Sequence, residues 1–186
     1  AAAAEDLPPS RVGRVSAVDG SVAVRPAGGE WADSGVNDPV ASGMSVRTPA
    51  QGRAVLRIGA ETIALAASSE LDLARLDSGL TQIVLRQGRI GVRLSQLNPT
   101  RTIELVVARG RVWLLTAGDY DITAGDERGP ARIVVFDGRV RFVGKGPGDT
   151  ATDITTAAGS ATVPSGGDPL VASHDGAATD AFVAWW

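Results

Sequence analysis

Hydrophobic and polar residues alternate in short runs over residues 11–143. Valine, isoleucine and leucine recur at every second position within each run, and glycine-containing pairs separate the runs. A period of two with glycine punctuation is typical of antiparallel sheet. The pattern predicts an all-β fold, an antiparallel sandwich or rolled sheet of about a dozen short strands joined by hairpins. The expected strands cover residues 14–18, 21–25, 45–48, 54–58, 62–65, 70–76, 81–86, 89–94, 102–107, 111–115, 120–123, 132–136 and 139–142.

Several joints between these runs have the chemistry of tight turns. The pairs Asp19-Gly20 and Asp137-Gly138 each lie between two alternating runs. Asp-Gly readily adopts the positive backbone dihedrals that two-residue hairpin turns require. Gln87-Gly88, Arg109-Gly110 and Ile58-Gly59 are weaker versions of the same signal. We therefore expect a hairpin at each of the five pairs.

A short pattern, glycine followed by arginine and an aliphatic residue, occurs five times along the chain. Its copies are separated by 39, 36, 22 and 28 residues, so they hold no fixed period. A solenoid would keep one period, so the pattern indicates similar hairpins in one sheet structure. The copies begin at Gly13, Gly52, Gly88, Gly110 and Gly138.

The composition changes after Val143, which divides the chain into three parts. Residues 1–10 form an N-terminal lead, residues 11–143 a β-domain, and residues 144–186 a tail rich in glycine, proline, alanine and threonine. The tail has few large side chains, so we expect it to add short strands, near 153–156 and 170–172, to the first domain. Residues 179–186 predict one or two helical turns with Thr179 as the N-cap.

Composition and charge narrow the classes of partner. The chain has 186 residues, a formal net charge of -3 and 44% hydrophobic residues, which is typical of a globular protein. No apolar stretch approaches the roughly 20 residues that cross a bilayer, so no transmembrane segment is expected. No dense basic run is present, which argues against nucleic-acid binding. We expect protein partners.

Candidate chemistry is sparse, and we predict that the chain is not an enzyme and holds no cofactor or metal. It has no cysteine and one histidine, His174, which lies in the glycine-rich tail beside Asp175 without a Gly-x-Ser-x-Gly nucleophile elbow. Asp119 and Asp121 share one face of a predicted strand, and we interpret them as a solvated hairpin end. The phosphate-loop-like residues 144–150 lack the required Gly-Lys-Ser/Thr order. A carboxylate-dependent hydrolase remains an alternative and needs two carboxylates roughly 5–10 Å apart.

Four aromatic residues are the candidate partner-binding residues: Trp113, Phe182, Trp185 and Trp186. Trp113 lies on the strand face opposite its neighbours, where it is either buried between sheets or exposed at an interface. Two adjacent tryptophans cannot both point inward on one short element, and indole rings are enriched at interface hot spots. The terminal segment therefore docks either on the protein's own sheet or on another subunit.

The N-terminus predicts export. Residues 1–4 are a run of alanines, which is typical of the sequence left after a signal peptide has been cleaved behind small residues. We therefore expect a periplasmic protein whose signal peptide has been removed.

The order of the motifs resembles a FecR-type domain. Such domains open with the motif Gly-x-Val-x-x-x-x-Gly-x-Val. A tryptophan in a loop follows, and then a Gly-x-x-Val-x-Thr motif before a strand. The similar residues here are 8–25, Trp31, 43–48, 53–59, 63–65, 71–73, 85–92, 112–120 and 134–140. In related exported proteins a segment with an acidic residue, a phenylalanine and a tryptophan follows, similar to Asp180, Phe182 and Trp185.

The resemblance implies a β-rich module of the bacterial envelope that works through protein contact. Such modules are best known from regulators that relay a signal from an outer-membrane receptor to a sigma factor. Residues 1–186 hold neither the cytoplasmic helical segment nor the membrane helix of those regulators. We therefore expect an accessory subunit that docks on or stabilises a larger envelope assembly, such as a membrane-bound enzyme complex. The alternative is a soluble periplasmic signalling domain related to the FecR sigma-factor regulators.

Overall fold

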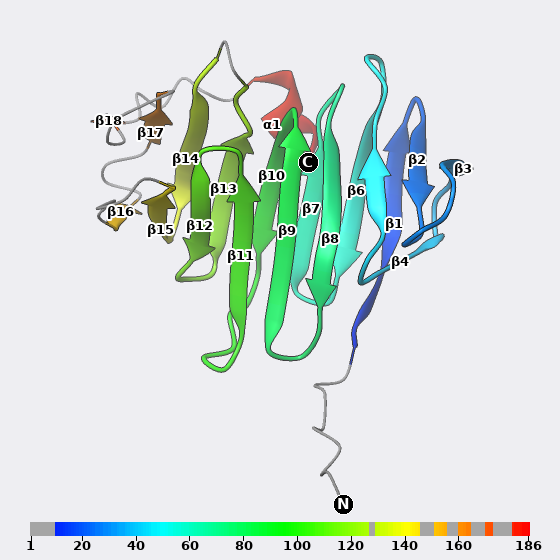
Figure 1. Ribbon diagram of the computed structural model, residues 1–186, viewed down its shortest axis with the longest axis horizontal. Helices are drawn as coiled ribbons and strands as arrows, with labels where there is room; N and C mark the ends of the chain where they lie inside the picture. Colours follow the sequence, from blue (N-terminus) through cyan, green and yellow to red (C-terminus); the bar gives the residue numbers. More distant parts are fainter. Residues whose placement is uncertain (1–9, 127–128, 146–150, 156–159, 165–169, 173–179) are drawn as a thin grey trace, which may run out of the picture.

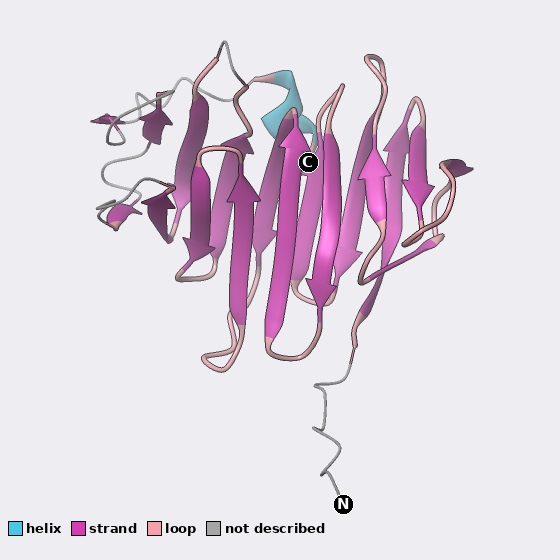
Figure 2. Ribbon diagram, in the orientation of Figure 1, coloured by secondary structure: helices cyan, strands magenta, loops and turns pink. Residues whose placement is uncertain are grey.

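Strands dominate the computed structural model, which describes residues 10–126, 129–145, 151–155, 160–164, 170–172 and 180–186. Figure 2 shows these strands together with one short helix, α1 (Ala181–Trp185). The predicted all-β fold is confirmed. Within the described residues, no helix is long and apolar enough to cross a membrane.

Within the described residues, the strands form two sheets of nine strands each (Figure 1). Neighbouring strands are antiparallel in both sheets except for β9 and β11, which are parallel. The first sheet has the order β18 (Leu170–Ala172), β17 (Ser160–Val163), β14 (Ala131–Asp137), β13 (Gly118–Thr123), β10 (Arg89–Leu94), β7 (Glu61–Leu65), β6 (Arg53–Ile58), β1 (Val12–Asp19), β4 (Pro39–Ala41). The second has the order β16 (Thr152–Thr155), β15 (Arg139–Gly144), β12 (Gly110–Leu114), β11 (Thr102–Val107), β9 (Leu80–Gln87), β8 (Glu70–Leu76), β5 (Ser45–Arg47), β2 (Val22–Arg25), β3 (Ala32–Ser34).

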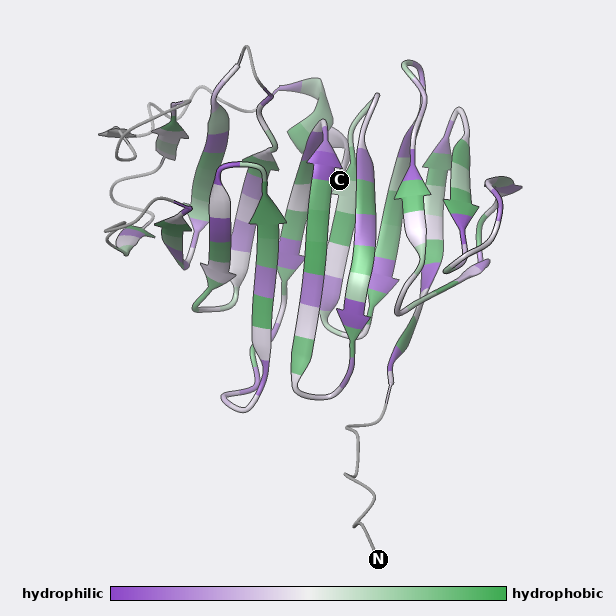
Figure 3. Cartoon of the chain, viewed as in Figure 1, coloured by the Kyte–Doolittle hydropathy of each residue, from purple (hydrophilic) through white to green (hydrophobic). Residues whose placement is uncertain are grey.

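A single hydrophobic core lies between the two sheets. Successive residues of a strand point to opposite faces, so every second side chain enters this core; Figure 3 shows the alternation along the strands. In β6, for example, Ala54, Leu56 and Ile58 are completely buried, whereas Arg53 and Arg57 face outward. Complete burial of a leucine or isoleucine contributes about 1.5–3 kcal/mol, which makes this core the main stabilising feature.

Three of the five predicted hairpins are instead corners between the two sheets. The chain passes from one sheet to the other between β1 and β2, between β9 and β10, and between β14 and β15. The hairpin prediction is therefore wrong for Asp19-Gly20, Gln87-Gly88 and Asp137-Gly138. It holds at Ile58-Gly59 and Arg109-Gly110, which connect paired strands. The three corner glycines have φ values of 81°, 83° and 105°, so a corner requires the same backbone conformation as a primed turn.

The glycine-arginine-aliphatic pattern has one structural meaning at all five positions. The aliphatic residue is buried in each copy, and the arginine lies on the outer face, either exposed or half-buried. The pattern therefore marks the point where a strand starts and its inward face is set. The arginines are Arg14, Arg53, Arg89, Arg111 and Arg139, and the aliphatic residues are Val15, Ala54, Ile90, Val112 and Val140.

The described parts of the tail extend the same two sheets. β16 pairs with β15 at the edge of the second sheet, and β17 and β18 extend the first sheet beyond β14. β16 and β18 lie close to the expected positions. The short strands β3, β4 and β17 are missing from the sequence-based set.

One end of the sandwich is closed by a buried charge network around Glu61. Its carboxylate is 1% exposed and accepts hydrogen bonds from both terminal nitrogens of Arg11, at 3.1 and 2.5 Å. The Arg11 guanidinium also donates to the Thr81 hydroxyl at 3.1 Å. Glu61 belongs to the first sheet and Thr81 to the second, so Arg11 links the two sheets.

Candidate protein-interaction surfaces

Trp113 lies on the outer face of the second sheet, opposite the core. Its neighbours Val112 and Leu114 are buried between the sheets, whereas the Trp113 side chain is only half-buried. Of the two sequence-based alternatives for Trp113, burial between the sheets is therefore wrong. The alternative of an exposed position agrees with the structure.

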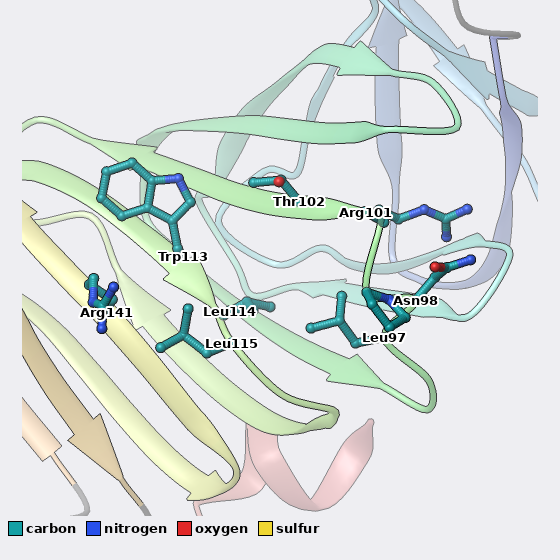
Figure 4. Close-up of a pocket in the computed structure, with 9 residues that line it drawn as sticks. Leu97, Asn98, Arg101, Thr102, Trp113, Leu114, Leu115 and Arg141 are labelled. Atoms are coloured by element: carbon teal, nitrogen blue, oxygen red, sulfur yellow. The ribbon is translucent and has the colours of Figure 1, made fainter.

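A groove of about 510 Å³ runs beside this indole, and we call it the Trp113 groove. One wall comes from the loop between β10 and β11, and the other from β12 and β15 (Figure 4). The apolar residues Leu97, Leu115 and Trp113 line the groove together with Arg101 and Arg141. Arg141 is held by Asp153, whose carboxylate accepts at 2.7 and 3.1 Å. The complete lining is Leu97, Asn98, Pro99, Arg101, Thr102, Trp113, Leu114, Leu115 and Arg141.

The three terminal aromatic residues lie on the outer face of the other sheet. Phe182 is only 7% exposed, and Trp185 and Trp186 are half-buried. The rings of Phe182 and Trp186 lie 6.2 Å apart, centre to centre. Docking on the protein's own sheet, one of the two alternatives for this segment, is thus the arrangement in the structure. Trp113 and the terminal aromatics consequently belong to separate surfaces.

The N-cap of α1 differs from the sequence-based prediction. Asp180 caps the helix, because its carboxylate accepts a hydrogen bond from the Val183 amide at 3.1 Å. The predicted cap, Thr179, lies outside the described residues. Asp180 also forms an ion pair with Arg89 of β10, which fixes the start of α1 to the sheet. Hydrogen bonds from Arg89 keep the pKa of Asp180 below its usual range, despite partial burial.

The surface beneath α1 is a trough whose floor is made of small residues and whose walls are arginines. Gly91 of β10 lies opposite Ala64 of β7, and both are buried on this outer face. Arg53, Arg89 and Arg93 rise around them, each over one aromatic ring. We call Arg53, Ala64, Arg89, Gly91 and Arg93 the arginine trough.

Each aromatic side chain of α1 has one guanidinium partner in the arginine trough. Arg53 lies 4.6 Å from the Trp185 ring, Arg89 5.0 Å from the Phe182 ring and Arg93 5.1 Å from the Trp186 ring. Arg93 also donates to the backbone carbonyl of Trp186 at 3.0 Å. A Cβ atom added to Gly91 would overlap the Trp186 indole, so glycine is required for this packing.

Asp121 corrects the interpretation of the two strand aspartates as a solvated hairpin end. Both lie in β13, but Asp121 is buried and pairs with Arg89 at 2.7 Å, whereas Asp119 pairs with Arg93 at the surface, at 2.9 Å. Burial raises the pKa of Asp121, and its hydrogen bonds to Arg89 oppose this rise. The two aspartates therefore position two arginines of the trough, Arg89 and Arg93.

Deletion of Phe182–Trp186 is expected to lower the thermal midpoint of the domain by about 3–6 °C. Burial of one large aromatic side chain stabilises the fold by about 1.5–3 kcal/mol. Two effects oppose this gain: the segment loses conformational entropy, and Trp186 Nε1 is buried without a hydrogen-bond partner. A net loss of about 1.5 kcal/mol gives that shift for a domain of this size. Differential scanning calorimetry measures it. An unchanged midpoint would show that α1 contributes nothing to the stability of the sheet.

The other buried carboxylates in the described part of the chain are paired with arginines. The buried carboxylates of Glu61, Asp77, Glu104 and Asp121 each form an ion pair with an arginine. Among the described residues no group of three histidine or acidic side chains is arranged to hold a metal ion. His174, Asp175 and residues 146–150 lie outside the described residues.

The arginine trough is not among the sites expected from the sequence. Its signal is present in residues 89–93, where two arginines flank Gly91 at a spacing of two and therefore lie on its face of the strand. Outward arginines are common on strands, so this spacing alone does not identify a site.

Comparison with solved structures supports the fold. Two crystal structures, at 2.50 and 1.65 Å resolution, of a "putative anti-sigma factor" from Parabacteroides distasonis ATCC 8503 are similar to the chain. Each gives a TM-score of 0.60 at 10% sequence identity and covers 70% of this chain. The match covers 60% of that protein's chain. At this identity the similarity shows a shared fold.

No protein-family model and no curated protein matches the chain.

Proposed function

We propose that this chain is a non-catalytic protein-interaction module of the bacterial envelope, which acts in the periplasm after export. It docks on or stabilises a larger assembly, such as a membrane-bound enzyme complex, as an accessory subunit. The observation that carries this proposal is the Trp113 groove, where a half-buried indole borders an open apolar hollow on the outer face of a sheet.

The chemistry of the Trp113 groove suits a protein side chain. An apolar residue of a partner that fills the groove would cover Trp113, Leu97 and Leu115, and burial of such a residue contributes about 1.5–3 kcal/mol. Arg141 also lines the groove, and its guanidinium can donate hydrogen bonds to backbone carbonyls or carboxylates of the partner. An apolar centre with a polar rim is typical of a protein interface.

The pairing of buried carboxylates with arginines supports the non-catalytic part of the proposal. A hydrolase of the glycosidase type needs two carboxyl groups that face a common cleft, one of them free to hold a proton. Each buried carboxylate of the described residues instead lies against a guanidinium. The hydrolase alternative therefore has less support than binding.

A signalling role is the second candidate, because of the similarity of the fold to that of the anti-sigma factor structures. In that case the partner would be an outer-membrane receptor or a membrane-bound regulator of a sigma factor. The identity of the protein bound at the Trp113 groove distinguishes the two candidates.

The test combines photocrosslinking with substitution at the groove. A photoreactive residue replacing Leu115, in native protein from the periplasmic fraction, is expected to crosslink to one defined protein, whereas the same residue replacing the exposed Val36 is not. Trp113→Ala should weaken this complex about 30-fold or more, because a hot-spot side chain contributes at least about 2 kcal/mol. Trp31→Ala is the matched control, since Trp31 is also half-buried but packs between Arg25 and Arg47, away from the groove.

Two results would contradict the proposal. One is the same crosslinking pattern from both positions. The other is an undiminished complex with Trp113→Ala while circular dichroism shows that the variant is folded.

A further inference from the structure

The arginine trough is arranged as a recognition site. Its arginines are held by partners in the sheet domain itself, since Arg53 pairs with Asp19, Arg89 with Asp121, and Arg93 with Asp119. None of these acids belongs to α1, so each of the three arginines has an ion-pair partner in the sheet domain that does not depend on α1. Its floor is Gly91, where even one methyl group would overlap the bound indole. A preorganised site of this kind loses little conformational entropy when a ligand binds.

The bound segment shows which chemistry the trough recognises. An acidic residue, Asp180, pairs with Arg89, and three aromatic rings follow at positions 182, 185 and 186, each facing one guanidinium. Spacings of three and four residues place Phe182, Trp185 and Trp186 on one side of a helix. The trough therefore selects a short helix with an acidic cap and this aromatic pattern.

The contact between α1 and the trough has features of an exchangeable one. α1 has only five residues and contributes no strand hydrogen bonds to the sheet. The indole nitrogen of Trp186 is buried without a hydrogen-bond partner, which destabilises the docked arrangement. Two of the cation–aromatic contacts involve half-buried tryptophans, where water weakens the attraction.

We propose that the arginine trough is a binding site for an acidic–aromatic helical segment of a partner protein, and that α1 is its resident intramolecular ligand. The partner's segment displaces α1 and makes the same contacts. Charge complementarity identifies this occupant, because the guanidiniums around the small-residue floor suit a carboxylate followed by aromatic rings. The trough and the Trp113 groove lie on different sheets, so this proposal stands independently of the proposed function.

The experiment uses the full chain with Phe182→Ala and Trp186→Ala, so that α1 no longer fills the trough. A fluorescent peptide with the sequence of residues 180–186 is titrated against this variant, and anisotropy reports binding. We expect the peptide to bind the double variant about tenfold more tightly than the wild-type chain, in which tethered α1 competes at an effective concentration of roughly millimolar. A peptide with asparagine in place of its aspartate should bind more weakly, because it loses the ion pair with Arg89.

Gly91→Ala, added to the double variant, provides the decisive comparison. Alanine suits a strand at least as well as glycine, so the sheet should stay folded while the added methyl group blocks the indole. We expect peptide affinity to fall at least tenfold. Gly35→Ala, where an added methyl group meets open space, is the matched control and should leave affinity unchanged.

Three outcomes would overturn the proposal. The first is no peptide binding by a double variant that circular dichroism shows to be folded. The second is equal binding with and without Gly91→Ala. The third is a dimer of the wild-type chain in analytical ultracentrifugation that becomes a monomer with Gly91→Ala. The segment bound in the trough would then come from a second copy of the chain. Trp113→Ala should not affect peptide binding, so failure here is distinguishable from failure of the proposed function.

Discussion

Replacement of Arg11 by methionine is expected to lower the free energy of unfolding by about 3 kcal/mol, since removal of one partner leaves the buried carboxylate only partly compensated. Glu61 is 1% exposed and would keep Arg101 as a partner, with its nitrogen 3.4 Å from one carboxylate oxygen. The other carboxylate oxygen would lose its ion-pair partner. The hydrogen bond that joins Arg11 to Thr81 of the opposite sheet would also be lost. Urea denaturation, followed by circular dichroism, measures the change.

Two further variants separate the charge effect from a loss of packing. Arg14→Met removes an exposed arginine on the same edge of the sandwich, and we expect a change within about 0.5 kcal/mol. The double variant Arg11→Met with Glu61→Leu should recover most of the loss, because a buried ion pair can be replaced by apolar residues at little cost. If the double variant loses as much unfolding free energy as the sum of the losses in the two single variants, Arg11 and Glu61 are not coupled. Such a result would contradict the role given to this ion pair.

Replacement of Gly138 by alanine is the second large effect, again about 3 kcal/mol, from a strained backbone and overpacking together. Gly138 has φ of 105° at the corner between β14 and β15. Its added methyl group would overlap the hydroxyl of Tyr120, which is completely buried and donates to the Thr116 carbonyl at 2.8 Å. The thermal midpoint should fall by about 6–12 °C.

The control for Gly138→Ala is Gly28→Ala, which has a similar left-handed backbone, with φ of 68°, but meets no neighbouring atom. It should show the backbone cost alone, about 1 kcal/mol. Adding Tyr120→Phe to Gly138→Ala makes room for the methyl group, so the pair should lose less stability than the sum of the single variants. A simple sum would mean that the overlap with the hydroxyl has no energetic role.

The sequence was sufficient to predict strands but insufficient to assign them to a sheet. Alternation reveals which side chains enter a core, and Ala54, Leu56 and Ile58 are where the pattern places them. The same alternation holds whether the next strand pairs with its predecessor or crosses to the opposite sheet. Positive φ at Gly20, Gly88 and Gly138 serves a corner as well as a hairpin, so local chemistry could not separate the two.

The candidate surfaces were predictable to different degrees. The outward position of Trp113 follows from the burial of Val112 and Leu114, because a strand has a period of two. The destination of Trp186 does not follow from any local pattern. It depends on Gly91, which is 95 positions away in the chain and becomes its neighbour only after the sheet has formed. Burial of Asp121 does not follow from a local pattern either. The outer face of β13 that carries Asp121 is covered by α1 and Arg89, which are distant from it in the sequence.

Repeated crossing between the sheets also bears on how the chain acquires its structure. Because β1, β10 and β14 belong to one sheet and their immediate neighbours β2, β9 and β15 to the other, no contiguous half of the sequence contains a complete sheet. The parallel strands β9 and β11 are connected through β10, which lies in the opposite sheet. Such non-local pairings must overcome loop-closure entropy before any core is buried, and they are associated with slow, all-or-none acquisition of structure on a timescale of roughly milliseconds to seconds. We therefore expect the two layers to form together, in one cooperative transition.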